Sequence, residues 1–514
     1  MRIGWFSPFP PVRTGIAGRS AELVAALEAR GYAIDRYPEA AAHDFPWRHR
    51  QAPYDLVVYQ FGNSSHHDYA WPYALRYPGL VVLHDTRLHH ARAALLLREK
   101  RAADYRAELA WSEPAVSPDA AELAIAGFDS RLYYDWPMVR GLVASSRLTA
   151  VHGNAAREEL IAALSTPNVT TPKIQAKTQA ANAEAINAQS ADSHLDAVSR
   201  IVSIRLGEGE LVSPEREARA RREIRRRYDI APDAIVFASF GGMTPEKRLP
   251  QILAALRATL RHAPNAHLLL AGARAAHYDV AAGIAALDLQ RHVTVAGYLE
   301  RDADLTDHLA ACDVSLNLRW PTARETSGPW LRALAGARPT IITDLVHLAD
   351  VPSLDPRTWT VREARAAEGE VRPAAPEGSL EPRASNPESR DPRTSHLAPR
   401  TSHSAPRTPH LAPRTPHPVC VAIDILDEDH SLRLAMRRLA EDAALRAELG
   451  AAAREWWQRE HAVEVMVGDY ERAIAAAMAR PDPDATLPPH MRNGGDGRLR
   501  TILSAFGLSS PLDR

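Results

Sequence analysis

Two stretches of this chain alternate short apolar runs with patterns of helical spacing, and this alternation constrains the fold more than any other feature. In the first stretch, Ser20–Arg30 has apolar residues at helical spacing, and His89–Ala110 is typical of a second helix. The apolar runs of strand length are Arg2–Phe6, Asp55–Gln60, Leu80–Leu83, Leu148–His152 and Ile201–Ile204. Strands that alternate with helices imply parallel strands with helical crossovers, so we expect an α/β unit here.

The same alternation returns after residue 233. The expected strands are Ala234–Phe240, His267–Ala271, His292–Val295, Val314–Leu318, Pro339–Thr343 and Val419–Ile425. The expected helices are Leu249–His262, Asp302–Ala311, Pro329–Gly336, Ser431–Arg459 and Ala462–Arg480. A second parallel sheet wrapped by helices follows from this pattern. The sequence therefore predicts two Rossmann-like α/β domains in tandem, whose parallel sheets face each other across a cleft.

Two segments interrupt this pattern. Residues 166–199 are rich in Thr, Gln, Asn, Ala and Ser, and residues 365–418 are rich in Pro, Arg, Ser and Thr. The second segment repeats every seven residues, with histidines at His396, His403, His410 and His417. A proline in every repeat excludes a continuous helix, so we interpret both segments as weakly ordered insertions. Metal binding by the four histidines is the alternative, although a flexible chain provides no neighbouring groups to hold the histidines in position.

These boundaries divide the chain into an N-terminal domain over residues 1–204, a C-terminal domain over residues 205–480 and a polar tail over residues 481–514. Without the two insertions and the tail, each domain is of ordinary size for an α/β unit. Removing residues 365–418 is therefore expected to leave the activity largely intact.

The composition excludes several classes of protein. The 62 basic and 63 acidic residues give a net charge of −1, which argues against a nucleic-acid protein held by a dominant positive field. The chain has two cysteines, which are too few for a framework of disulfide bonds. No apolar run approaches the roughly 18 residues of a membrane-spanning helix, and the stretch that begins at Met1 is too short for a signal peptide. We expect a cytoplasmic protein.

The stretch Phe240–Arg248 is the first candidate site. Gly241 and Gly242 follow a strand directly, and glycines there let a backbone approach a ligand closely. A helix that begins near Lys247 offers its free N–H groups to an anion. Lys247 and Arg248 together suit a diphosphate, and Lys247 is one of only four lysines in the chain. An ordinary strand-to-helix turn with a solvated basic pair is the alternative.

A second candidate site follows the strand Val314–Leu318. Ser327 or Thr326 is placed to cap the next helix, and the free N–H groups of this turn form a second anion site. Glu325 beside them is able to accept hydrogen bonds from sugar hydroxyls. Ordinary helix capping is again the alternative. Both stretches leave strand ends of one sheet, where ligands of open α/β sheets bind.

Together these motifs resemble family 4 of the glycosyltransferases, retaining enzymes of the GT-B fold. The glycine-containing loop Pro10–Gly18, the run Tyr59–Asn63 and the pair His84-Asp85 resemble one bacterial branch. Gly241–Arg248 resembles the family's diphosphate site. Arg319–Arg332, which contains Pro-Thr-Ala-Arg-Glu-Thr-Ser-Gly, resembles the branch's donor motif.

The resemblance implies a nucleotide-diphosphate sugar as substrate, bound mainly by the C-terminal domain, while the N-terminal domain receives the acceptor. Lys247 and Arg248 would neutralise the diphosphate, Glu325 would contact the transferred sugar, and His84 would contact it from the N-terminal domain. The implied donor-binding residues are Gly15, Gly241, Gly242, Arg319, Thr326, Ser327 and Gly328.

The implied reaction moves a hexosyl unit to a hydroxyl acceptor, a glycan or a glycolipid, with retention. The absence of an obvious carboxylate nucleophile fits front-face attack, in which the departing phosphate deprotonates the acceptor. Neither a metal nor a cofactor is expected, because Lys247 and Arg248 supply the charge. The chain is then a metal-independent enzyme of polysaccharide biosynthesis, with at most peripheral contact with the inner membrane face.

One departure from the family leaves an alternative open. The family's second glutamate falls eight positions after Glu325, where this chain has Ala333, preceded by Arg332. A non-catalytic, two-lobed nucleotide-sugar-binding protein derived from such an enzyme would also suit this loss. A membrane-surface role is a further alternative, since His89–Ala110 combines Leu95-Leu96-Leu97 with basic residues as an interfacial helix would. We favour an ordinary amphipathic helix docked on its own sheet.

Overall fold

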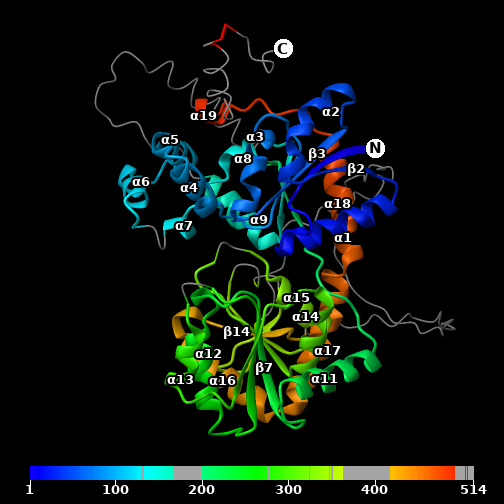
Figure 1. Cartoon of the computed structure of the whole chain (residues 1–514), viewed down its shortest axis with the longest axis vertical. Coiled ribbons are helices and arrows are strands. Elements are labelled where there is room, and N and C mark those ends of the chain that lie inside the picture. Colours follow the sequence, from blue (N-terminus) through cyan, green and yellow to red (C-terminus); the bar gives the residue numbers. More distant parts are fainter. Residues whose placement is uncertain are drawn as a thin grey trace, which may run out of the picture.

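The computed structural model describes residues 1–128, 132–165, 199–275, 278–322, 325–345, 348, 351–362, 417–492, 504 and 506–507. These residues build two sheets, one in each half of the molecule, and the halves lie one above the other in Figure 1. The expected insertions at 166–199 and 365–418, with their histidine repeat, and most of the tail at 481–514 lie outside the described residues.

The first sheet contains six parallel strands in the order β2-β1-β3-β4-β5-β6. Their bounds are β1 Arg2–Phe6, β2 Ala33–Tyr37, β3 Leu56–Phe61, β4 Leu80–Leu83, β5 Leu148–His152 and β6 Ile201–Ile204. The sequence pattern missed β2, an edge strand whose middle residues Asp35 and Arg36 are polar. Since β2 and β3 lie on opposite sides of β1, the strand order reverses between β1 and β3, and ligands of open α/β sheets bind at such a reversal.

Helices cover both faces of this sheet (Figure 1). They are α1 Gly15–Ala29, α2 Phe45–Gln51, α3 Trp71–Ala74, α4 His89–Arg98, α5 Ala102–Ser112, α6 Pro118–Ile125, α7 Leu132–Asp135, α8 Arg140–Ser145 and α9 Asn154–Leu164, with 3₁₀ turns η1 Glu39–Asp44 and η2 Ser65–Ala70. Helix α1 begins because the Thr14 hydroxyl accepts the N–H of Ala17 at 3.1 Å.

The single helix expected over His89–Ala110 is instead two helices, α4 and α5. The chain turns at Lys100, which has a left-handed φ of 59°. Leu95 and Leu96 are buried, and Leu97 packs against the apolar cluster that contains Leu96. The leucine triplet therefore faces the protein interior, as an amphipathic helix docked on its own domain requires.

The second sheet contains eight strands in the order β13-β12-β14-β11-β10-β7-β8-β9. Their bounds are β7 Ile235–Phe240, β8 Ala266–Ala271, β9 Val293–Gly297, β10 Val314–Asn317, β11 Thr340–Thr343, β12 Ser353–Leu354, β13 Val361–Arg362 and β14 Cys420–Ile423. Among these strands β12 and β13 pair antiparallel and the other pairs are parallel. The strand order reverses between β7 and β10, whose loops are the two stretches that the sequence singled out.

The helices of the second half again lie on both faces of its sheet (Figure 1). They are α11 Pro214–Arg227, α12 Leu249–Thr259, α13 Val280–Ala286, α14 Asp302–Ala311, α15 Gly328–Ala335, α16 Glu428–Glu441 and α17 Ala443–Glu460, with 3₁₀ turns η3 Pro245–Lys247 and η5 Ile425–Asp427. The long helix expected over Ser431–Arg459 is divided at Asp442, whose carboxylate caps α17 by accepting the N–H of Leu445 at 2.9 Å.

Helix α18, Val463–Met478, follows the second sheet in the sequence but packs on the first sheet, beside α1 (Figure 1). Tyr470 stacks on Trp5 of β1 with ring centroids 6.0 Å apart. Asp469 accepts hydrogen bonds from the backbone N–H of Arg205 at 2.8 Å and from its guanidinium at 2.9 Å. The short helix α19, Pro489–Arg492, follows on the same half. Within the described residues, no helix has the length and apolar character needed to span a membrane.

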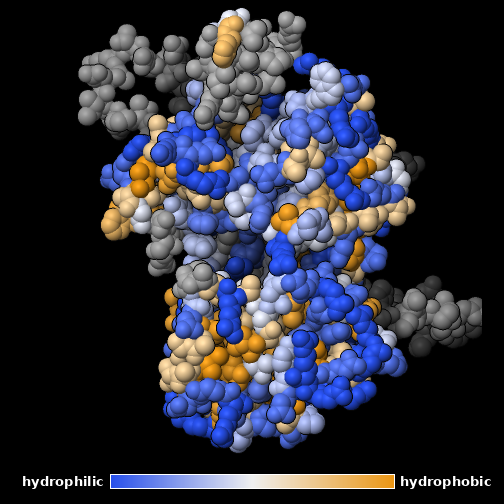
Figure 2. Space-filling model, in the orientation of Figure 1, coloured by the Kyte–Doolittle hydropathy of each residue, from blue (hydrophilic) through white to orange (hydrophobic). Residues whose placement is uncertain are grey.

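The two halves are joined at two places in the chain, at residues 205–213 and at residues 461–462. Glu208 lies at this junction and pairs with Arg19 of α1 and Arg332 of α15, so one carboxylate connects both halves. A continuous apolar cluster also extends from the first sheet to α15 and α17. The space-filling view shows the surface hollowed where the halves meet (Figure 2).

Candidate active site

The turn after β7 brings Lys247 over Gly241. Gly241 has a φ of 108°, which only glycine adopts readily, and a Cβ added there would lie 3.4 Å from the Lys247 Nζ. Gly272, at the end of β8, packs so closely that a Cβ would lie 1.7 Å from the Gly241 carbonyl oxygen. Gly241 and Gly242 are exposed. The backbone of this turn is therefore accessible to a ligand, and the Lys247 ammonium lies beside it.

Arg248, the second cation expected in this turn, is held elsewhere. Its side chain forms an ion pair with Glu428, the first residue of α16, with the Arg248 Nε 2.9 Å from each carboxylate oxygen. Glu428 is buried and Arg248 is partly exposed. A buried carboxylate needs a positive partner, so this contact engages the guanidinium in packing α16 against the start of α12.

The turn after β10 supplies a different cation. Arg319 forms an ion pair with Oε1 of Glu325, and the Thr322 hydroxyl donates a hydrogen bond of 2.7 Å to Oε2. The backbone N–H of Trp320 donates to the carbonyl oxygen of Glu246 at 2.9 Å, which ties this turn to the turn after β7. Arg319 and Glu325 are consequently fixed next to the Lys247 turn.

Ser327 caps α15, as the sequence predicts: its hydroxyl accepts the N–H of Trp330 at 3.4 Å. Gly328 is the first residue of the helix, and Thr326 precedes the cap. Thr326, Ser327 and Gly328 are each partly exposed. The first turn of α15 thus begins shortly after Glu325, and Ser327 accepts the N–H groups of both Trp330 and Leu331.

The pKa values support this grouping. The pKa of Lys247 is lowered to about 8, mainly by burial and also by the positive charge of Arg319, while the carboxylate of Glu325 partly opposes both effects. The three side chains are therefore within electrostatic reach of one another. The structure brings Lys247 together with Arg319 and Glu325, whereas the sequence paired Lys247 with Arg248.

His84, at the end of β4, belongs to a hydrogen-bonded chain in the N-terminal half. Its Nε2 lies 2.7 Å from Oε1 of Gln60, and its Nδ1 lies 3.1 Å from Nε2 of His152. The Tyr470 hydroxyl donates to the same Gln60 oxygen at 3.2 Å. Burial holds the pKa of His84 well below its usual range, with His152 adding to the effect. His84 is therefore a neutral, oriented imidazole.

Asp85, the next residue, faces the second half. Its Oδ2 accepts the backbone N–H of Asn63 at 2.6 Å. The pKa of Asp85 is raised to about 7, mainly by burial and also by the carboxylate of Glu325, while Asn63 and Arg319 act in the opposite direction. Asp85 was not among the site residues expected from the sequence, although it follows a buried strand directly. The influence of Glu325, which is distant in sequence, appears only in the folded chain.

Gly15 lies at the N-terminus of α1 and is exposed. A Cβ added there would meet nothing within 4 Å, so Gly15 faces open space. Just before it, Arg13 reaches the second half, with its guanidinium 3.1 Å from Glu300 and 5.2 Å from the ring centroid of Tyr298. The loop after β1 therefore spans the gap between the halves.

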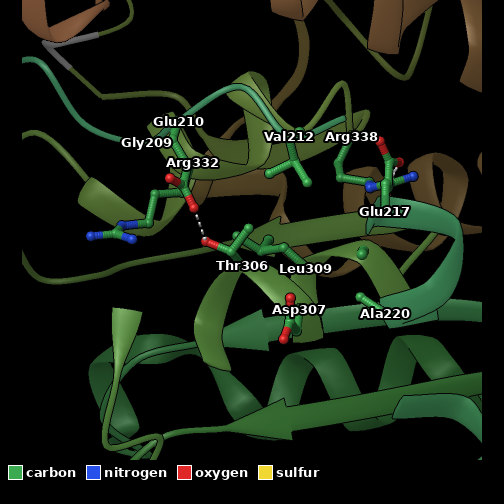
Figure 3. Close-up of a pocket in the computed structure, with 12 residues that line it drawn as sticks. Gly209, Glu210, Val212, Glu217, Ala220, Thr306, Asp307, Leu309, Arg332 and Arg338 are labelled. Carbon is green, nitrogen blue, oxygen red and sulfur yellow. Dashed lines mark hydrogen bonds and ion pairs between the residues drawn. The ribbon is translucent and has the colours of Figure 1, made fainter. Parts of the chain in front are cut away.

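A cavity at the junction is separate from this group of side chains. Glu210, Val212, Glu217, Thr306, Arg332 and Arg338 are among the residues around it in Figure 3. Its volume of about 30 Å³ is enough for one or two water molecules and far too small for a nucleotide sugar. Arg332, which precedes the position of the family's second glutamate, is held by Glu208 and by Asp302 at 3.1 Å.

Across the described parts of the chain, no group of three or more His, Cys, Asp or Glu side chains is arranged to hold a metal ion. Lys247, Arg319 and Glu325 on one half influence one another and Asp85 on the other half. Tyr134 of α7 joins them, since Glu246, Arg319, Glu325 and Asp85 all influence its pKa, which burial raises.

Residues 220–320 match the family model of glycosyl transferases group 1. The structure is similar to sucrose-phosphate synthase from Thermosynechococcus elongatus, with a TM-score of 0.52, 14% identity, and coverage of 93% of this chain and 100% of that one. It is also similar to the catalytic domain of starch synthase IV from Arabidopsis thaliana, bound to ADP and acarbose, with a TM-score of 0.53, 10% identity and coverage of 93% and 99%. No curated protein sequence matches the chain. Two α/β halves with parallel sheets that meet at a cleft, together with these likenesses, confirm the expected GT-B fold.

Proposed function

We propose that the protein is a retaining glycosyltransferase that moves a hexosyl unit from a nucleoside-diphosphate sugar to a hydroxyl group of a glycan or lipid-linked acceptor. The observation that carries this proposal is the group formed by Lys247, Arg319 and Glu325 at the strand-order reversal of the second sheet. This group faces Asp85 of the first sheet. The similar starch synthase domain, which was solved with ADP and acarbose, makes a nucleotide and a sugar reasonable ligands for such a cleft.

The chemistry follows from the charges. Departure of a nucleoside diphosphate places negative charge on its phosphate oxygens, and positioned cations lower that barrier. Among the described residues, Lys247 and Arg319 are cations suited to this purpose, with the exposed backbone of Gly241 and Gly242 beside them. Arg248 contributes to the position of the turn through Glu428.

Glu325 is suited to hold the sugar by hydrogen bonds, whereas Gln60 and His152 engage both ring nitrogens of His84, which leaves only its ring carbons for a sugar. Thr322 and Arg319 fix the Glu325 carboxylate, which accepts hydrogen bonds from hydroxyls. His84 is neutral, and its partners Gln60 and His152 fix its ring. In this proposal Lys247 and Arg319 oppose the negative charge of the leaving diphosphate, and no metal takes part.

The test is nucleoside-diphosphate release by the full chain with a panel of UDP-, GDP- and ADP-sugars. Lys247→Ala and Glu325→Gln are expected to lower release by on the order of 10²-fold, the usual effect of removing one stabilising group from a transition state. Lys100→Gln is the matched control, since Lys100 is exposed in the turn between α4 and α5.

The outcomes separate two functions. Release that depends on Lys247 and Glu325 but not on Lys100 supports the transferase. Tight nucleotide binding without release from any donor would instead favour the two-lobed binding protein, to which the loss of the second glutamate at Ala333 points.

A further inference from the structure

The first half contains a second cavity, and none of the candidate active-site residues lines it. Its volume is about 340 Å³, which is within the range of cavities that hold small ligands. Its walls come from η1, η2, α3, α4 and α19, so we call it the α19 cavity. Helix α19 lies at the end of the first half that is away from the second half (Figure 1). The α19 cavity is therefore outside the cleft.

A buried ion pair holds one wall of the α19 cavity in place. Arg92 of α4 is only 5% exposed, and its Nε and Nη2 donate to the two carboxylate oxygens of Glu108 at 2.6 and 2.8 Å. The guanidinium also lies over the ring of Trp71, 4.6 Å from its centroid. Within the described residues, no hydrogen bond to the remaining Nη1 is found. Arg92 is therefore a rigid donor on the cavity wall with one nitrogen left for a ligand.

His490 of α19 places an acceptor next to this donor. Its Nε2 lies 3.1 Å from Oε2 of Glu108, the same oxygen that accepts Nη2 of Arg92, and His490 lines the cavity as well. Burial alone would raise the pKa of Glu108, but Arg92 and His490 outweigh burial and lower that pKa, so the carboxylate is ionised. The His490 Nε2 therefore donates, and Nδ1 of the neutral ring is an acceptor. No hydrogen bond to this Nδ1 is found in the described part of the chain.

The charges around the α19 cavity do not favour a charged ligand. Each arginine on its walls has an acidic partner: Arg92 pairs with Glu108, Arg98 with Asp68 at 3.1 Å, and Arg101 with Asp104 at 2.8 Å. Glu39 and Glu99 line the cavity too, and both are exposed. A phosphate or carboxylate would thus meet no excess of positive charge, and a cation would meet the guanidinium of Arg92. A neutral ligand suits these walls.

We propose that the α19 cavity binds a neutral saccharide unit, whose hydroxyl groups accept from Nη1 of Arg92 and donate to Nδ1 of His490. A hydroxyl both donates and accepts, so it satisfies both atoms without adding a charge. Trp71, Leu75 and Leu95 supply apolar wall for the C–H groups of the sugar. A cavity at the small end of the range for ligand sites holds about one or two sugar rings. This site goes beyond the proposed function, because it is outside the cleft and takes part in no transfer.

The test is saturation-transfer difference NMR of the full chain, titrated with maltose, cellobiose, lactose or methyl α-mannoside, with and without UDP. We expect at least one of these saccharides to bind in both conditions. Arg92→Lys keeps a positive partner for Glu108 but removes the Nη1 donor. We expect this variant to weaken saccharide binding by about tenfold or more, the usual effect of losing a hydrogen bond to a charged group.

His490→Phe is a second variant that does not depend on the Arg92 pair. It keeps an aromatic ring on α19 and removes the Nδ1 acceptor, so we expect a loss of affinity of similar size. Because α19 is a short helix near the end of the chain, the fold does not depend on His490. The melting temperature of each variant identifies those that keep the fold, and His490→Phe decides the test if Arg92→Lys does not.

Two controls separate this site from its surroundings. Arg106 of α5 makes an equivalent two-bond contact with Glu122, at 2.5 and 2.8 Å, but Arg106 is exposed and does not line the cavity. Arg106→Lys is therefore expected to keep the wild-type affinity for the saccharide. Glu325→Gln changes the cleft alone and is expected to keep it as well.

Three results would overturn the proposal. If Glu325→Gln weakens saccharide binding and neither Arg92→Lys nor His490→Phe does, the sugar binds in the cleft. If none of the four saccharides binds at about 10 mM, the cavity is no saccharide site. If inorganic phosphate binds and Arg92→Lys abolishes its binding, the cavity takes an anion. Saccharide binding by a chain that releases no nucleoside diphosphate would support this site and contradict only the transferase.

Discussion

Lys247 changes its charge within the range of pH that an assay covers, since its pKa is lowered to about 8. As pH rises through this value the ammonium loses its proton, and under the proposed function a bound diphosphate loses this cation. We predict that affinity for UDP or ADP falls above about pH 8, by tenfold or more when the full interaction of about 1.5–3 kcal/mol is lost. Titration calorimetry on both sides of this pH measures the effect.

Lys247→Arg is the matched variant, because a guanidinium stays protonated throughout. Its affinity is expected to vary little with pH, whatever its absolute value. A wild-type affinity that is equally flat would mean that the Lys247 ammonium does not contact the diphosphate.

At the scale of single elements, most strands and helices could be predicted from apolar spacing, but the breaks between helices could not. Lys100 turns the chain with a left-handed φ of 59°, although glycine is the usual residue for that conformation. Asp442 ends one helix and caps the next, yet an aspartate inside a helical pattern gives no clear stop signal. Strand β2 was missed because only its last residue is buried.

The residues of the candidate site could also be predicted only in part. Lys247 and Glu325 follow strands of one sheet, and carboxyl ends of parallel strands meet at one edge. The partner of Arg248 is 180 residues away, at Glu428, and Asp85 acquires its raised pKa partly from Glu325 on the other half. Contacts between residues so far apart in the sequence cannot be predicted from the local spacing of apolar residues.

The docking of α18 gives a prediction at this scale. Asp469 is buried and holds both the backbone and the guanidinium of Arg205, so Asp469→Ala is expected to lower the free energy of unfolding by on the order of 2 kcal/mol. Asp482→Ala is the control. Asp482 also pairs with an arginine of the first half, Arg147, but it is 58% exposed, and such pairs contribute about 0–1 kcal/mol.

Chemical denaturation measures both variants, and hydrogen exchange locates the loss in α18. Equal effects of the two substitutions would contradict the assignment of α18 docking to Asp469.

For the whole molecule, the sheet register predicts that residues 365–416 are dispensable. Ser353 of β12 pairs with Arg362 on one side and with Cys420 on the other, so these two described residues, which flank the segment, lie two strand spacings apart, about 10 Å. A Gly-Ser linker of about six residues spans this distance. We expect the shortened protein to keep its affinity for UDP or ADP and to melt within a few degrees of the full chain. A failure to fold would show that the segment contributes to the second sheet.

The return of α18 to the first sheet also determines when each half is completed during synthesis. Met466, Val467 and Ile474 cover a face of the first sheet that begins at Ile3 and Trp5, so nearly the whole chain must leave the ribosome before that face is closed. The second half has all of its strands before α18 emerges. Although domains usually mature in the order of translation, here the half made first is finished last, and its apolar face stays open to chaperones for most of the time that the chain is being made.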